Sequence, residues 1–180
     1  MSLRDRQSST AAPSPPIEAI QALIPDIPEV LEFESWWIGH DGNKRYMLIL
    51  YFTALKQFQI LADDSKVPLT IGVMDRTGES LRAWDLHVGA TIDILGRPTT
   101  LMSCTLRTMR WLADNSRRLW KVKEALERRV NKFRAVPSVT LTAGMFKRMT
   151  TSTAALGGTV HLGRIATCVH SLELELRHYQ

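Results

Sequence analysis

The stretch from Trp84 to Trp111 constrains the fold most, because it predicts a β-hairpin that passes directly into a long helix. Its first strand alternates between polar and apolar residues, with Ile92 and Ile94 on one face, as a half-buried strand does. Gly96 to Pro98 predicts a tight reversal, because glycine tolerates positive φ and proline fixes φ. Residues 99–104 predict the second strand. The pattern indicates an α+β domain in which the two isoleucines face the core.

Three more strands are predicted upstream of this stretch. Residues 31–37 alternate and are rich in aromatic side chains, and residues 40–43 predict a turn. Residues 44–52 form a strand too apolar to be an exposed edge, and residues 57–61 alternate again. We therefore expect a second hairpin of the same β domain.

Residues 114–136 predict an amphipathic helix, with Asp114-Asn115-Ser116 as its N-cap region and Pro137 after its end. One side is apolar within about 80° of arc and is expected to pack on the β domain. The apolar side consists of Leu112, Leu119, Val122, Leu126, Val130 and Phe133. The opposite side is basic within about 100° of arc and carries Arg117, Arg118, Lys121, Arg128 and Lys132.

This helix supplies the whole basic excess of the chain. The net charge is +5 over 180 residues, but residues 107–135 hold ten Lys/Arg and three Asp/Glu, a net of +7. A solvated face is the simpler interpretation, yet such concentration favours an acidic partner. We select Arg117, Lys121, Arg128 and Lys132 as candidate partner-binding residues. Trp120 lies off the apolar arc, so we add it as a candidate interface anchor.

The two ends of the chain are predicted to be extensions of the domain. Residues 1–30 are expected to be an extended or disordered tail, with a short helical turn after residue 16. A mitochondrial presequence is a weaker alternative for this basic start. Residues 137–180 are Thr-rich without a clear period, and predict a short helix at 145–156 and one or two strands within 159–176. We expect this extension to pack on the domain or on a neighbouring protein.

The motifs of most enzymes and cofactor sites are missing from the sequence. There is no phosphate-binding loop, no dinucleotide fingerprint, no EF-hand loop and no run of about 20 apolar residues that could span a membrane. No second Cys/His pair at zinc spacing accompanies Cys168 and His170. The chain has two cysteines, Cys104 and Cys168, which do not make a disulfide framework. We therefore predict no catalytic residue, no cofactor and no metal site.

Short motifs, in matching order over residues 31–111, resemble the DM-ten domain of ciliary axonemal proteins. An aromatic strand with Phe33 and Trp37 precedes the RYMLILYF run, and D-L-H-V-G follows at residues 85–89. Ile92-Asp93-Ile94-Leu95-Gly96-Arg97 and Ser103-Cys104-Thr105-Leu106-Arg107-Thr108 complete the match. The turn at 53–56 and the strand at 69–72 depart from the family pattern. The resemblance implies a small β-barrel of pleckstrin-homology type over residues 31–113, followed by the basic helix.

The same resemblance implies a non-enzymatic structural protein of the ciliary or flagellar axoneme. Such a protein would bind tubulin and neighbouring axonemal proteins as a microtubule inner protein of doublet microtubules, without nucleic acid or a membrane span. The alternative is a pleckstrin-type adaptor for phosphoinositide membranes or peptides, although residues 53–56 supply only one lysine for such a site. RNA binding is disfavoured because the helix lacks interleaved aromatic and basic residues.

Overall fold

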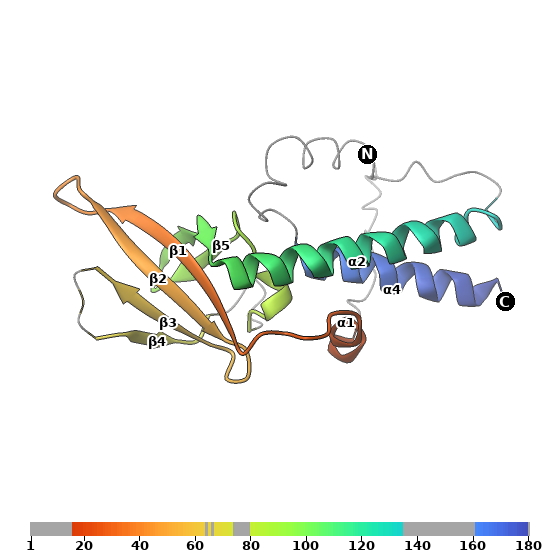
Figure 1. Ribbon diagram of the computed structural model, residues 1–180, viewed down its shortest axis with the longest axis horizontal. Helices are drawn as coiled ribbons and strands as arrows, with labels where there is room; N and C mark the ends of the chain where they lie inside the picture. Colours follow the sequence, from red (N-terminus) through yellow and green to blue (C-terminus); the bar gives the residue numbers. More distant parts are fainter. Residues whose placement is uncertain (1–15, 64, 66, 74–79, 135–160, 180) are drawn as a thin grey trace, which may run out of the picture.

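The computed structural model describes residues 16–63, 65, 67–73, 80–134 and 161–179, and its fold is of the predicted α+β class. An open sheet lies at one end, and two long helices lie side by side and extend away from it (Figure 1). In chain order the elements are α1 Ile17–Leu23, β1 Val30–Ile38, β2 Lys44–Phe52, β3 Gln57–Ala62, β4 Leu69–Ile71, the 3₁₀ turn η1 Ala83–Asp85, β5 Thr91–Ile94, β6 Arg97–Thr100, β7 Ser103–Cys104, α2 Leu106–Val130 and α4 Leu162–His178.

The main sheet has five antiparallel strands in the order β4-β3-β2-β1-β7. It confirms the strands predicted at 31–37, 44–52 and 57–61 and the turn between the first two. Alternate side chains point to its inner face, where the register pairs Phe33 with Ile49 and Ile49 with Ile60. All three are buried, so this face carries one side of the core.

The predicted hairpin forms as β5 and β6, a separate two-stranded sheet. Ile92 and Ile94 are buried while Thr91 and Asp93 are exposed, as the alternation predicts. The second predicted strand is interrupted after Thr100, because the chain there leaves the hairpin and β7 pairs with β1. The described strands thus form an open sheet and a hairpin, without the closed barrel that the family resemblance implies.

Helix α2 begins eight residues earlier than predicted. Thr105 precedes it in an extended conformation, and its carbonyl oxygen accepts a hydrogen bond from the Met109 amide at 2.9 Å. The predicted N-cap region therefore lies inside the helix. Asn115 is buried there, where its side-chain amide donates to the Trp111 carbonyl at 3.0 Å, and Ser116 is buried too. A polar run can sit mid-helix in this way when it packs against another element.

The strands predicted within 159–176 are wrong, since this segment is helix α4. Its buried side chains recur at helical spacing, which the Thr-rich flank and the alternation of Leu172, Leu174 and Leu176 obscure in the sequence. Helix α4 begins in contact with η1. A Cβ atom at position 163 would lie 3.0 Å from Trp84 Cδ1, closer than a Cβ normally approaches another side chain, so the close approach suits glycine. The short helix predicted at 145–156 lies outside the described residues.

The apolar side of α2 packs mainly on α4, which corrects the expectation that it faces the β domain. The two helices run parallel, and their C-terminal ends meet where Phe133 stacks on Tyr179 with ring centroids 5.3 Å apart. Phe133 is 52% exposed, so it does not belong to the buried arc as predicted. Short helix α1, which forms where a helical turn is predicted, packs against α4.

Candidate interaction surface

The exposed side of α2 is basic along its whole length. Seven arginines and lysines of α2, and Lys132 just after it, have exposed side chains within about 120° of arc. Asp114 and Glu124 are the exposed acids among them. A helix of 25 residues is about 37 Å long, so the stripe is extended. We call it the basic face: Arg107, Arg110, Arg117, Arg118, Lys121, Arg128, Arg129 and Lys132.

The four basic residues selected from the sequence, Arg117, Lys121, Arg128 and Lys132, all have exposed side chains on this face. Arg107 and Arg110 lie before the predicted start of the helix, and Arg129 lies within the predicted helix but was not included in its basic side. Thr105, a favoured N-cap residue type, is the signal that could have extended the helix and with it the basic face.

Local contacts restrain some of these side chains only weakly. Arg117 lies 3.1 Å from Asp114, but both side chains are about 70% exposed, so the pair adds little stability. Arg128 donates to the carbonyl of Glu124 at 3.2 Å. Arg118 is held more firmly, because it donates to the Leu23 carbonyl at the end of α1 and to Asn115 Oδ1. The basic face thus presents charge without a fixed internal partner for most of its length.

Trp120 lies at the border of this face and is partly buried against the core. The Lys123 ammonium lies 5.0 Å from the centroid of its ring, within the range of a cation–π interaction. Lys123 itself is buried and forms an ion pair with Glu127, so it is not part of the basic face. The Trp120 side chain therefore has a packing role in the monomer, whatever it contributes to an interface.

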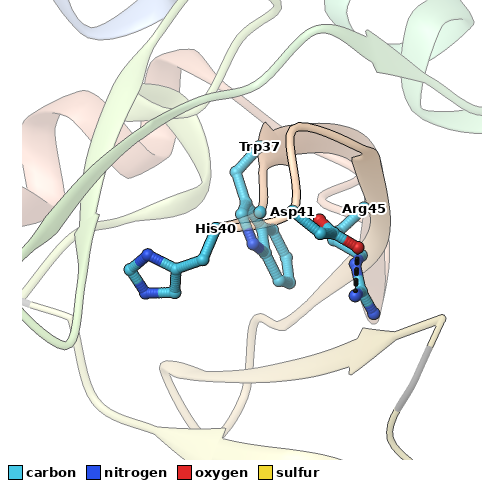
Figure 2. Close-up of a pocket in the computed structure, with 5 residues that line it drawn as sticks. Trp37, His40, Asp41 and Arg45 are labelled. Carbon is cyan, nitrogen blue, oxygen red and sulfur yellow. Dashed lines mark hydrogen bonds and ion pairs between the residues drawn. The ribbon is translucent and has the colours of Figure 1, made fainter.

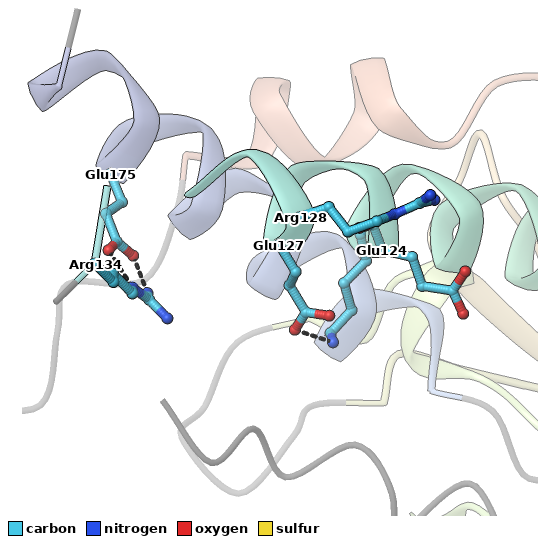
Figure 3. Close-up of polar contacts among 6 residues, drawn as sticks. Glu124, Glu127, Arg128, Arg134 and Glu175 are labelled. Atoms are coloured by element: carbon cyan, nitrogen blue, oxygen red, sulfur yellow. Dashed lines mark hydrogen bonds and ion pairs between the residues drawn. The ribbon is translucent and has the colours of Figure 1, made fainter. Parts of the chain in front are cut away.

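Another ion pair links the distal ends of the two long helices. Arg134 Nε donates to Glu175 Oε1 at 2.6 Å, and a terminal guanidinium nitrogen donates to Oε2 (Figure 3). The hydrogen bonds from Arg134 hold the pKa of Glu175 below its usual value. This pair therefore joins the segment after α2 to α4, 41 residues apart in the chain.

Two histidines meet where α4 begins. The rings of His87 and His161 have centroids 5.5 Å apart, and His161 Nδ1 accepts from the Arg164 amide as the N-cap of α4. Burial, followed by the charges of His87 and Arg164, lowers the pKa of His161 to about 4. Burial likewise lowers the pKa of His87. Both rings are therefore neutral at pH 7, which suits a structural cap.

A small hollow lies at the turn between β1 and β2, lined by Trp37, Gly39, His40, Asp41 and Arg45 (Figure 2). Hydrogen bonds from Asn43, and then from Arg45, lower the pKa of Asp41. The hollow measures about 270 Å³ and is open to solvent, below the usual range of about 300–1,000 Å³ for ligand pockets. Arg45 and Asp41 pair with each other there, so the geometry stabilises a turn rather than a ligand site.

The described ranges contain no cluster of three or more His, Cys, Asp or Glu that could hold a metal ion. Cys104 is half-buried and Cys168 is exposed, and both are free thiols. Among these same residues, no helix has the length and apolar character needed to cross a lipid bilayer.

Comparison with known proteins adds no family to these observations. No protein-family model matches the chain, and no curated protein sequence matches it significantly. The similarity to the DM-ten family stays a hypothesis based on the short motifs themselves.

Proposed function

We propose that this protein is a non-enzymatic structural component of the ciliary or flagellar axoneme that binds tubulin inside doublet microtubules. The observation that carries the proposal is the basic face of α2. It places seven exposed cationic side chains on one helix and an eighth, Lys132, just after it, and it is the counterpart of an acidic surface such as that of tubulin.

The resemblance supplies the specific identity of the partner. The motifs at 85–89, 92–97 and 103–108 lie at the end of η1, in the β5–β6 hairpin and at the start of α2. The finer assignment to a pleckstrin-homology-type fold rests on this order of strands followed directly by a helix. Neighbouring axonemal proteins would contact the remaining surface.

The energetics favour collective action over any single contact. Exposed ion pairs each contribute about 0–1 kcal/mol, so several charges must act together. Their attraction falls with ionic strength until the interface is desolvated. Binding of the isolated protein to microtubules should therefore be salt-sensitive and should depend on several residues of the basic face.

Co-sedimentation with stabilised microtubules tests this dependence. We expect the variant Arg117→Glu/Lys121→Glu/Arg128→Glu/Lys132→Glu to remain folded and to lose most binding. A matched control reverses four exposed cations elsewhere, at Lys56, Arg97, Arg164 and Arg177, and should bind nearly as wild type does. If the helix variant stays folded and still binds normally, the basic face is only a solvated surface.

The adaptor alternative receives no comparable support. The β2–β3 turn offers Lys56 as its single cation, whereas a phosphoinositide headgroup needs several converging ones. Sedimentation with vesicles containing phosphatidylinositol phosphates distinguishes the two functions, because the axonemal proposal expects no binding through this turn.

A further inference from the structure

The outer face of the main sheet carries a row of apolar side chains along β2, with further apolar side chains on β1 and β3. In the register, Trp36 pairs with Tyr46, Leu48 with Leu61 and Leu50 with Gln59. Side chains at alternate positions share one face of a sheet, so these neighbours lie opposite Phe33, Ile49 and Ile60. We call this surface the outer apolar face: Trp36, Tyr46, Leu48, Leu50, Phe52 and Leu61.

The core lies on the other side of the sheet, and within the part of the chain that the structure describes this face is at least partly accessible. The buried residues of β2 are Met47, Ile49 and Tyr51, all on the inner face, whereas Tyr46 is 54% and Leu61 38% exposed. A strand that is apolar on both faces is typical of a sheet covered on both sides. The β2 sequence therefore indicates that a second layer covers the outer face of the sheet. Exposed apolar surface of this kind marks interaction sites.

Charges among these side chains restrict what can cover them. Glu32 and Glu34 alternate with the inward residues of β1 and pair with Leu50 and Leu48. Asp63 extends β3 beside Tyr46, whose amide donates to its carboxylate at 3.3 Å. Stacking two copies sheet against sheet would place these carboxylates against apolar side chains, which is costly. The covering surface must therefore bring cations together with apolar area.

The chain itself carries a surface of that chemistry. Residues 16–105 hold twelve Asp/Glu and seven Lys/Arg, a net of −5, whereas residues 106–134 carry +7. Arginine and lysine have long aliphatic stems that cover apolar surface, and guanidinium groups stack on aromatic rings. Lys44, on the same face of β2, lies 4.4 Å from the centroid of the Trp36 ring, so one cation–π contact is already made on this face within the monomer.

We propose that the outer apolar face binds the basic face of α2 from a second copy of this chain, so that copies associate head to tail. The two surfaces are different parts of the molecule, and the distal half of α2 extends away from the sheet (Figure 1). Such a contact is heterologous and need not close, so a dimer formed in this way retains one unused outer apolar face and one unused basic face. Short open-ended oligomers follow.

This association shares the basic face with the proposed function but does not depend on it, because it is measured in the pure protein. Tubulin should compete with it, since both occupy the same cations. A protein that binds microtubules but stays monomeric would contradict only the present inference. One that self-associates but ignores microtubules would contradict only the proposed function.

Sedimentation velocity of the full chain at 10–500 μM supplies the test. We expect the average mass to rise above the 20.4 kDa monomer with concentration, and to return to monomer as salt increases. The sheet variant Glu32→Lys/Glu34→Lys and the helix variant with four Glu on the basic face should each be monomeric. The control Glu18→Lys/Glu173→Lys makes the same charge change away from both surfaces and should associate normally.

Mixing the variants tests the head-to-tail geometry. The sheet variant retains an intact basic face and the helix variant an intact outer face, so together they should form a dimer that does not grow. A second, charge-neutral sheet variant, Tyr46→Ser/Leu61→Ser, should behave as the first does, and circular dichroism checks that each variant is folded. Monomeric wild type at every concentration, or a helix variant that still associates alone, would overturn the proposal.

Discussion

The ammonium of Lys123 lies 2.5 Å from a carboxylate oxygen of Glu127, and both side chains are largely buried at 8% and 15% exposure. The pair sits one helical turn apart on the side of α2 that packs against the rest of the molecule. Lys123 is therefore a buried, paired residue and does not belong to the exposed cations of the basic face. Its buried charge is balanced by Glu127 and would be uncompensated without that partner.

Removal of that partner should be strongly destabilising. Glu127→Ala leaves the buried Lys123 charge uncompensated, for which we expect a loss of about 3–5 kcal/mol in the free energy of unfolding. The double variant Lys123→Met/Glu127→Leu removes both charges and should recover most of that loss. Urea denaturation of the wild type, the single variant and the double variant measures these free energies of unfolding. A single variant as stable as the wild type would show that the pair is solvated.

The neutral His161 cap predicts a stability that falls in mild acid. The pKa of His161 is about 4 in the folded state, against about 6.5 when unfolded. The unfolded chain therefore binds the proton more readily, so stability falls as the pH drops from about 6.5 towards 4. His161→Asn keeps a capping acceptor without titrating. Its unfolding free energy should decline less between pH 7 and pH 5, and an unchanged slope would exclude this origin.

The β5–β6 hairpin tests the position of the core. Ile94 is 9% exposed, so Ile94→Ala should cost about 2–5 kcal/mol, as truncations of buried isoleucine do. Thr91→Ala on the exposed side of the same strand should change stability by less than about 0.5 kcal/mol. Thermal or urea unfolding distinguishes these outcomes. Equal effects at the two positions would mean that the strand does not have one buried face.

Strands were predictable where local alternation decides their structure. β1, β3 and β5 alternate between inward apolar and outward residues, and β2 is a continuous apolar run of strand length. The open arrangement of the sheet was not predictable, because closure of a barrel depends on long-range pairing. The short β7 strand, at residues 103–104, pairs with β1 across about 70 residues of chain.

The helices were harder than the strands to predict from local sequence patterns. α4 buries Leu162, Ile165, Val169, Leu172 and Leu176 at spacings of three and four. The alternation of Leu172 to Leu176 over only five residues favoured a strand instead, because short segments fit both periods. The basic face was predictable from charge alone, but its extension to Arg107 required the correct helix start.

Localisation in a ciliated or flagellated cell tests the central proposal most directly. Tagged full-length protein should remain with axonemes after detergent extraction and a high-salt wash, and should lie along their length. The variant with four glutamates on the basic face should shift to the soluble fraction while staying folded. A uniform cytosolic or mitochondrial signal for the wild-type protein would contradict an axonemal role.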